Sequence, residues 1–312
     1  MLHFSNQTLS DIMKILSHTI EKQADGSTIE FQVVNPDINT SLYSGNVLFI
    51  NNQEYIYRGY KNWIDLAHLL SCKMLTPKEL SDTLVLIRFK KLQHSESFHI
   101  KQSLEEEKYG VDSIFSQIHK NEESSFLFHF TQSLKNVKVD KRLRILNLGI
   151  NSGDEFEVIQ NYSQNFENLE LIGIDYCPSA IKEAQKRFRS FSNITLYQHD
   201  INHLNELDLG EFDLIISIGT LQSSNLDFNP LLMSIVQNQL KKDGSMILGF
   251  PNCRWIDGEM IYGAKVKNYP FSEMGLLYKD VIFSKKYLQQ KKYRVTITGK
   301  DYIFLTATSI SK

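Results

Sequence analysis

A regular alternation of strand-like and helix-like segments, beginning at about Arg144, limits this chain to few architectures. Apolar runs that resemble strands are separated by stretches whose apolar residues follow helical spacing. The runs are RILNLGI (144–150), LELIGID (169–175), NITLYQH (193–199), FDLIISIG (212–219) and SMILGF (245–250). Such alternation is typical of parallel strands joined by crossover helices. The sequence therefore predicts an α/β fold with a doubly wound, mostly parallel sheet.

The end of the chain departs from this alternation. The segment RVTITGKDYIFLTATSI (294–310) contains two strand-like runs around a Gly-Lys-Asp turn. Two strands joined by a short turn pair antiparallel. We therefore expect the sheet to finish with an antiparallel C-terminal hairpin.

The first hundred residues have a less regular pattern. Short β-rich runs such as TIEFQVV (28–34) and TLVLIRF (83–89) are mixed with amphipathic stretches such as NWIDLAHLLSCKML (62–75). They predict a small N-terminal α/β domain over residues 1–100, which we expect to bind substrate or a partner. The main domain then covers residues 101–312, including lead-in helices within 109–137.

Composition and charge exclude several classes of protein. The 312 residues carry a net charge of −2 and contain no apolar stretch near the roughly 20 residues that span a bilayer, nor an N-terminal signal pattern. We therefore expect a cytoplasmic protein with no membrane partner. Three cysteines without a C-x-x-C pair predict reduced thiols and no metal site.

Glycines and acids stand where strands of the main domain end. Gly149 and Gly153 follow the first strand, where backbone can approach a ligand closely. Asp175 ends the second strand, 22 residues after Gly153, and is placed to accept hydrogen bonds from both hydroxyls of a ribose. Asp200 ends the third strand and is placed to accept from an adenine amine. These positions predict a nucleoside site.

With these residues in place, the segment from about Arg144 to the C-terminus resembles class I S-adenosylmethionine-dependent methyltransferases. NLGINSG (147–153) resembles the family's first motif, an acid followed by glycines spaced x-G-x-G-x-G, with Asn147 and Asn151 departing from it. The resemblance implies a seven-stranded sheet and S-adenosyl-L-methionine as the cofactor. The cofactor-binding residues that it implies are Asn147, Gly149, Asn151, Gly153, Asp175, Tyr176, Asp200, Ile201, Ile218 and Gly219. Because Asn147 supplies no charge, we expect weaker or differently arranged cofactor binding.

The long connection after the fifth strand, residues 250–280, is where many members of this family recognise substrates. It is dense in polar and aromatic residues, which favours a substrate-facing lid over a plain surface loop. The residues that we expect to contact the methyl acceptor are Gln222, Arg254, Trp255 and Tyr269. Glu259 and Tyr262 are the candidates for a catalytic base.

These observations favour a methyltransferase that acts on oxygen or nitrogen of a small molecule or biosynthetic intermediate. RNA, including tRNA, stays an alternative, because ten Lys and Arg against four Asp and Glu lie between Arg254 and Lys300. The near-neutral net charge does not favour nucleic acid. A catalytically inactive, cofactor-binding regulatory protein is a further alternative, based on Asn147 and Asn151. The sequence leaves the oligomeric state open.

Overall fold

The structure, a computed structural model, describes residues 1–39, 41–96, 107–223, 225–264 and 274–310. Contacts between residues divide the chain into two compact units. The first unit comprises Met1–Ile100 with Trp255–Ile261, and the second comprises Lys101–Arg254 with Tyr262–Lys312. The chain therefore leaves the second unit at Trp255 and returns to it at Tyr262.

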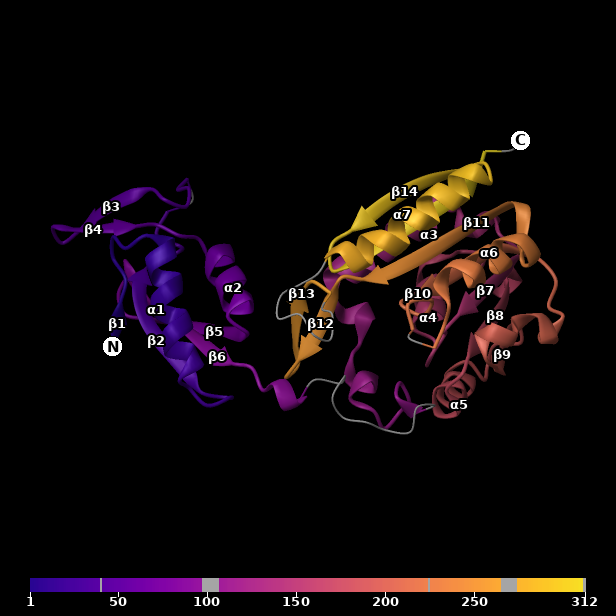
Figure 1. Ribbon diagram of the computed structural model, residues 1–312, viewed down its shortest axis with the longest axis horizontal. Coiled ribbons are helices and arrows are strands. Elements are labelled where there is room, and N and C mark those ends of the chain that lie inside the picture. Colours follow the sequence, from indigo (N-terminus) through magenta and orange to yellow (C-terminus); the bar gives the residue numbers. More distant parts are fainter. Residues whose placement is uncertain (40, 97–106, 224, 265–273, 311–312) are drawn as a thin grey trace. The chain divides into compact units, whose positions relative to one another are not determined.

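The second unit is built around a mixed sheet whose strands, within the described residues, number seven (Figure 1). Their order is β14-β15-β11-β10-β7-β8-β9. The strands are β7 (Arg144–Leu148), β8 (Glu170–Asp175), β9 (Ile194–Gln198), β10 (Phe212–Ile218), β11 (Leu240–Pro251), β14 (Tyr293–Gly299) and β15 (Tyr302–Ser309). Neighbours from β9 to β11 pair in parallel, whereas β15 pairs antiparallel with both β11 and β14. The predicted fold class, including the antiparallel hairpin, is confirmed.

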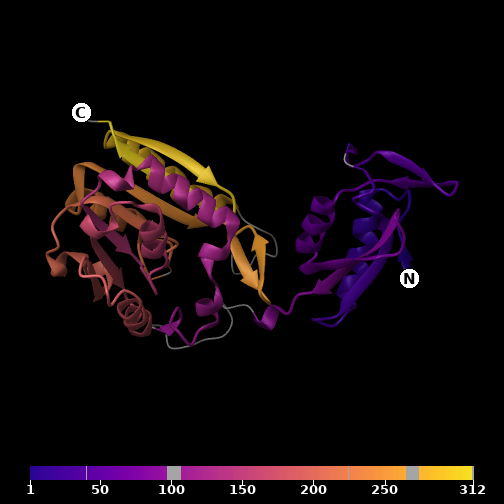
Figure 2. The same cartoon turned by 180° about the vertical axis from the view of Figure 1, so that it is seen from behind.

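Helices cover both faces of this sheet. They are α3 (Ser124–Asn136), α4 (Asp154–Tyr162), α5 (Pro178–Arg187), α6 (Phe228–Asn238) and α7 (Met274–Gln290). Helix α3 contacts α4, and the ring of Phe156 in α4 lies 6.2 Å from that of Phe188 at the end of α5, so these three helices share one face (Figure 2). Helices α6 and α7 contact each other on the opposite face (Figure 1).

Strand β7 shows how the two faces differ. Leu146 and Leu148 pack in the apolar core that contains Leu232 of α6 and Leu288 of α7. Because side chains alternate across a strand, Asn147 faces the side covered by α4. Asn147 is fully buried, so this strand carries a polar side chain into the interior just before its glycine turn.

The first unit has its own sheet and its own core. The sheet order is β1-β2-β6-β5, with a separate hairpin formed by β3 and β4. Its elements are β1 (Leu2–His3), α1 (Leu9–Glu21), β2 (Thr28–Val34), β3 (Val47–Ile50), β4 (Gln53–Ile56), α2 (Tyr60–Leu69), β5 (Cys72–Glu79) and β6 (Leu84–Lys91). Trp63 and Phe89 are almost completely buried in this core. The role that we predict for this domain stays a prediction.

A short hairpin from the connection after β11 contributes to the first unit. It consists of β12 (Cys253–Ile256) and β13 (Glu259–Tyr262). Ile256 and Ile261 are buried in one apolar cluster with Leu92. Residues Trp255–Ile261 therefore pack as part of the first unit although they are distant from it in sequence.

Three further observations concern the described ranges as a whole. No helix in them is long and apolar enough to cross a bilayer. No group of three or more His, Cys, Asp and Glu side chains in them is arranged to hold a metal ion. Cys72, Cys177 and Cys253 are buried free thiols.

Candidate functional site

The strand order of the second unit reverses between β7 and β10. From β7 the chain builds outward to β8 and β9, and then returns to β10 on the other side of β7. Ligands of such sheets bind beyond the carboxyl ends of the strands at this reversal. The turns after β7 and β10 touch there, because a Cβ on Gly149 would lie 1.8 Å from Thr220 Oγ1. The predicted cofactor turn therefore lies where the fold favours a ligand.

The turn after β7 depends on three residues with positive φ. These are Gly149 (78°), Asn151 (48°) and Gly153 (98°). Asparagine is one of the few residues other than glycine that enter the left-handed region readily. Asn151 therefore keeps the backbone conformation that glycine provides elsewhere in the motif. Gly153 also permits close packing, because a Cβ there would lie 2.3 Å from the ring of Phe188.

We expect Gly149→Ala to lower the free energy of unfolding of the second unit by about 2 kcal/mol, because it adds left-handed strain and a clash with Thr220. Urea unfolding followed by circular dichroism measures this change. Gly258→Ala is the matched control, since Gly258 also has positive φ (74°) but no described atom lies within 4 Å of its Cβ position. Equal effects of the two substitutions would contradict the steric part of the prediction.

Asp175, the last residue of β8, ties two turns together. Its Oδ2 accepts a hydrogen bond from the Asn151 N–H (2.8 Å), and its Oδ1 accepts one from the Cys177 N–H (2.9 Å). Burial raises the pKa of the Asp175 carboxyl, and the N–H groups of Cys177, Asn151 and Tyr176 oppose this shift. A carboxylate offers about four acceptor positions, so Asp175 retains capacity for a hydroxyl donor.

Two side-chain amides near these turns contain buried polar atoms without a hydrogen-bond partner among the described residues. The atoms are Oδ1 and Nδ2 of Asn147 and Oε1 of Gln222. A buried polar group left unpaired costs about 1–3 kcal/mol. Asn147 precedes the glycine turn and Gln222 follows Thr220, so both stand at the reversal of strand order. Such donors and acceptors fit the ribose and amino-acid groups of S-adenosylmethionine.

The remaining predicted cofactor residues lie along the same edge of the sheet. Asp200 follows β9, and its Oδ1 accepts from the Asn202 N–H at 2.9 Å, at the start of the 3-10 helix Ile201–Leu207. The His199 N–H donates to the Asp175 carbonyl at 2.9 Å and so links the ends of β9 and β8. Ile201 and Ile218 are buried, Tyr176 is exposed, and Gly219 has a φ of 75°. The cofactor roles of these residues stay predictions.

The predicted acceptor residues are divided between the two units. Gln222 stands beside the cofactor turns, whereas Trp255 belongs to the first unit. Arg254 donates from Nη1 to the Gly263 carbonyl at 2.9 Å, and burial lowers the pKa of its guanidinium. Tyr262 is exposed, and Tyr269 lies outside the described residues. Their roles in acceptor binding and catalysis stay predictions.

Glu259 is held by a lysine and a histidine of the first unit. Its Oε2 lies 2.9 Å from Lys73 Nζ, and its Oε1 lies 3.3 Å from His68 Nε2. Burial raises the pKa of the Glu259 carboxyl, but the contacts with His68 and Lys73 outweigh burial and leave this pKa below its ordinary value. Asp257 lies 3.7 Å from Lys90 Nζ in the same unit. An ion-paired carboxylate is a weak proton acceptor. The catalytic role of Glu259 stays a prediction.

A buried ion pair beside the site is not indicated by any sequence pattern. Lys120 Nζ lies 3.2 Å from Glu155 Oε1, and both side chains are largely buried. Burial alone would lower the pKa of Lys120, but neighbouring carboxylates, above all that of Glu155, raise it above its ordinary value. Lys120 stands in the polar stretch HKNEESS, which looks like a surface linker. Glu155 stands in the first turn of α4, where acids are common on the surface.

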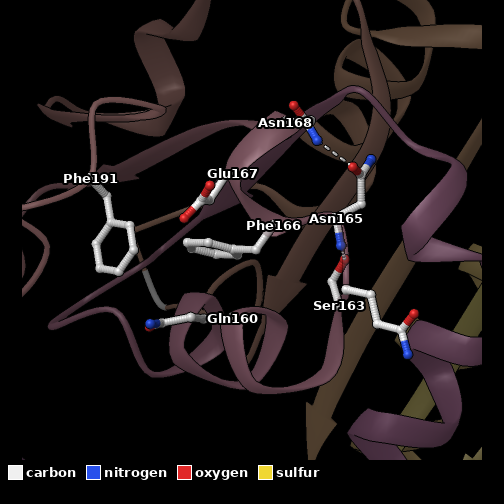
Figure 3. Close-up of a pocket in the computed structure, with 8 residues that line it drawn as sticks. Gln160, Ser163, Asn165, Phe166, Glu167, Asn168 and Phe191 are labelled. Carbon is white, nitrogen blue, oxygen red and sulfur yellow. Dashed lines mark hydrogen bonds between the residues drawn. The ribbon is translucent and has the colours of Figure 1, made fainter.

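A pocket of about 310 Å³ lies elsewhere on the second unit (Figure 3). Its lining includes Phe166 and Asn168, which precede β8, and Phe191, which precedes β9. It therefore opens at the amino ends of the strands, whereas Asp175 lies at the carboxyl end of β8. Ligands of parallel sheets bind at the carboxyl ends, so this pocket is not the cofactor site.

Comparison with protein families matches a profile described as "Methyltransferase domain" to residues 139–298. This range covers 160 of the 312 residues, slightly more than half of the chain. None of the curated proteins compared with the chain matches it.

Several solved structures align with the chain. The N-methyltransferase NodS from Bradyrhizobium japonicum WM9 aligns at 16% identity and a TM-score of 0.43, over 61% of this chain and 99% of that one. The precorrin-6y C5,15-methyltransferase from Geobacter metallireducens GS-15 aligns at 15% identity and a TM-score of 0.40, over 58% and 87%. The ribosomal protein L11 methylase from Lactobacillus delbrueckii subsp. bulgaricus aligns at 16% identity and a TM-score of 0.39, over 61% and 80%.

Proposed function

Because this chain belongs to the class I S-adenosylmethionine-dependent methyltransferase family, we propose that it transfers a methyl group to oxygen or nitrogen of a small molecule or biosynthetic intermediate. The observation that carries the proposal is the pairing of Asp175 with N–H groups of the turns that follow β7 and β8, at the carboxyl edge of the sheet. We infer that this partly buried carboxylate binds the ribose of the cofactor. The amide of Asn147, which has no hydrogen-bond partner in the described part of the chain, adds polar groups for the rest of the cofactor.

The chain's contribution to catalysis is mainly positional. S-adenosylmethionine supplies a methyl group that its sulfonium charge has already activated. The chain has to hold the acceptor atom in line with the methyl carbon and exclude water. Asp175 would hold the ribose of the cofactor, and the amides of Asn147 and Gln222 would bind its other polar groups. Glu259 is ion-paired, so we infer that positioning, and not a side-chain base, accounts for most of the rate enhancement.

We infer that the first unit takes part in recognising the acceptor. The connection after β11 carries Arg254, Trp255 and Tyr262, which we propose as acceptor contacts, together with Tyr269. Part of this connection, Trp255–Ile261, packs in the first unit. The net charge of −2 supports a small molecule over a polyanion.

Isothermal titration of the full chain with S-adenosylmethionine, S-adenosylhomocysteine and NAD tests the cofactor. Saturable binding of the first two compounds and not of NAD is the expected result. Release of S-adenosylhomocysteine in the presence of fractionated small-molecule extracts then tests the acceptor. Turnover with RNA and none with the small-molecule fractions would overturn the acceptor class.

RNA is the second candidate acceptor, and one observation favours it. Several exposed basic side chains are spaced from α7 to the start of β14. They are Lys279, Lys285, Lys286, Lys291, Lys292 and Arg294. Binding to RNA that weakens steeply with salt, and that Lys285→Glu with Lys286→Glu reduces, would support this candidate.

We expect Glu259→Gln to destabilise the first unit by about 0.5–1 kcal/mol at pH 7, because it removes the charge that pairs with Lys73 and His68. The pKa of Glu259 in the folded chain lies below its ordinary value. The Glu259 carboxylate therefore contributes fully to the stability of the fold at pH values above the ordinary pKa. This contribution is lost as pH falls through the folded pKa. The difference between the variant and the wild type should therefore shrink as pH falls through the folded pKa of Glu259.

Tryptophan fluorescence during urea unfolding measures this effect in the first unit alone. The chain has two tryptophans, Trp63 and Trp255, and both belong to this unit. Glu54→Gln is the control, since Glu54 is exposed on β4 and no ion pair of it occurs among the described residues. A loss in Glu259→Gln that stays the same as pH falls from 7 until the wild-type carboxyl is protonated would contradict the charge explanation.

A further inference from the structure

A segment that precedes the sheet is anchored on the cofactor turn. We call residues 107–123 the strap; it contains the 3-10 helices Ile114–Gln117 and Lys120–Glu122. The carbonyl oxygen of Tyr109 accepts a hydrogen bond from Asn151 Nδ2 at 2.8 Å. The Oδ1 of Asn151 accepts from the Ser152 N–H at 2.8 Å, and the Asn151 N–H binds Asp175. Asn151 therefore joins the strap, the glycine turn and the ribose-binding acid.

The strap is also anchored on the turn that follows Asp175. Ser179 donates from its Oγ and, at 3.3 Å, from its N–H to the carboxylate of Glu107. The Val111 N–H donates to Ser179 Oγ at 3.1 Å. Gly110 packs against both partners, because a Cβ there would lie 1.9 Å from Glu107 Oε2 and 2.5 Å from Ser179 Oγ. The start of the strap therefore fits closely over this turn.

The other end of the strap is anchored on α4. Asn121 Nδ2 donates to the Asp154 carbonyl at 3.1 Å and to Glu157 Oε2 at 3.0 Å. The neighbouring Lys120 forms the buried pair with Glu155. The strap therefore contacts the turn after β7 and the turn after β8, whose N–H groups bind Asp175. It also contacts α4, which begins directly after the glycine turn.

We propose that Asn151 is a positioning residue that holds the strap against the cofactor turn and thereby slows the release of the bound cofactor. This inference rests on the proposed function, since it assumes that Asp175 and its turns bind S-adenosylmethionine. Glycine at residue 151 would keep the positive φ and the backbone N–H that binds Asp175. It would have no side-chain donor for the carbonyl oxygen of Tyr109. The departure from the glycine motif therefore adds a function to the turn.

The test measures binding of S-adenosylhomocysteine to the immobilised full chain by surface plasmon resonance. Asn151→Gly is expected to raise the dissociation rate about tenfold, which is the effect of one lost hydrogen bond, with little change in the association rate. Asn151→Asp keeps an acceptor for the Ser152 N–H and tolerates positive φ, but it cannot donate to Tyr109. It should release S-adenosylhomocysteine at least as fast as Asn151→Gly does.

Asn52→Gly is the matched control, because Asn52 also has positive φ (63°) and lies in the β3–β4 turn of the first unit. It should leave both rates unchanged, and urea midpoints should show that every variant is folded. Unchanged dissociation in Asn151→Gly would overturn the inference, and so would fast dissociation in Asn151→Gly with wild-type dissociation in Asn151→Asp. Failure of the wild type to bind S-adenosylhomocysteine would instead overturn the proposed function.

Discussion

Lys120→Met is expected to lower the free energy of unfolding of the second unit by about 4 kcal/mol. The substitution removes the cation 3.2 Å from Glu155, whose side chain is 2% exposed. A carboxylate left unpaired in the interior loses its hydration without compensation, and this cost exceeds the value of an ordinary surface ion pair. Urea unfolding followed by circular dichroism at 222 nm measures the loss.

Two comparisons separate the buried charge from other effects of this substitution. Lys120→Met combined with Glu155→Leu replaces the pair with apolar side chains and should return the stability to within about 1 kcal/mol of the wild type. Tryptophan fluorescence, which reports the first unit, should not change in either variant. A loss below about 1 kcal/mol in Lys120→Met alone would contradict the buried-pair explanation.

Asp175→Ala is expected to weaken the binding of S-adenosylmethionine by about 3 kcal/mol, which corresponds to a rise of roughly 150-fold in Kd. Alanine removes the charged acceptor of a ribose hydroxyl, and a hydrogen bond to a charged group contributes up to about 3 kcal/mol. It also leaves the N–H groups of Asn151 and Cys177 without their carboxylate, so the turns lose their common anchor. Isothermal titration with S-adenosylmethionine measures the change.

Asp175→Asn should fall between the wild type and Asp175→Ala. Its oxygen accepts from one turn, but its NH₂ group faces the N–H of the other. Asp227→Ala removes an exposed carboxylate at the start of α6 and serves as the control with unchanged Kd. A rise of less than threefold in Asp175→Ala would show that the ribose assignment is wrong.

The second unit could be predicted from the sequence because its strands are buried on both faces. Strands such as β7 and β10 are therefore apolar almost throughout, and this pattern survives in the sequence without any structure. The antiparallel hairpin is visible because its turn, around Gly299, separates two β-rich runs. The first unit has shorter and less regular strands, so its sequence indicates an α/β class but neither strand order nor register.

Parts of the site could be predicted because backbone geometry restricts residue type. Gly149 and Asn151 adopt positive φ, and Asp175 stands at a strand tip where ligands of such sheets bind. The purpose of Asn151 could not be predicted, since the carbonyl that its side chain binds belongs to Tyr109, 42 residues away. Sequence spacing gives no information about such a contact.

Glu259 illustrates a different limit. A carboxylate in a long polar connection suggests acid–base chemistry, because reactive groups often lie in loops. Its partners His68 and Lys73 lie in the first unit, 191 residues away in the case of His68. An ion pair between segments so distant in sequence leaves no local pattern, so the sequence does not indicate these contacts of Glu259.

The return of residues Trp255–Ile261 to the first unit makes that unit discontinuous along the gene. A fragment that ends at residue 100 would lack Ile256 and Ile261 and would expose Leu92 to solvent. A fragment that begins at residue 101 would carry the hairpin without its packing partners. Exchange of the N-terminal unit between related enzymes therefore has to transfer two separate stretches of sequence together, so its evolution is tied to that of the connection after β11.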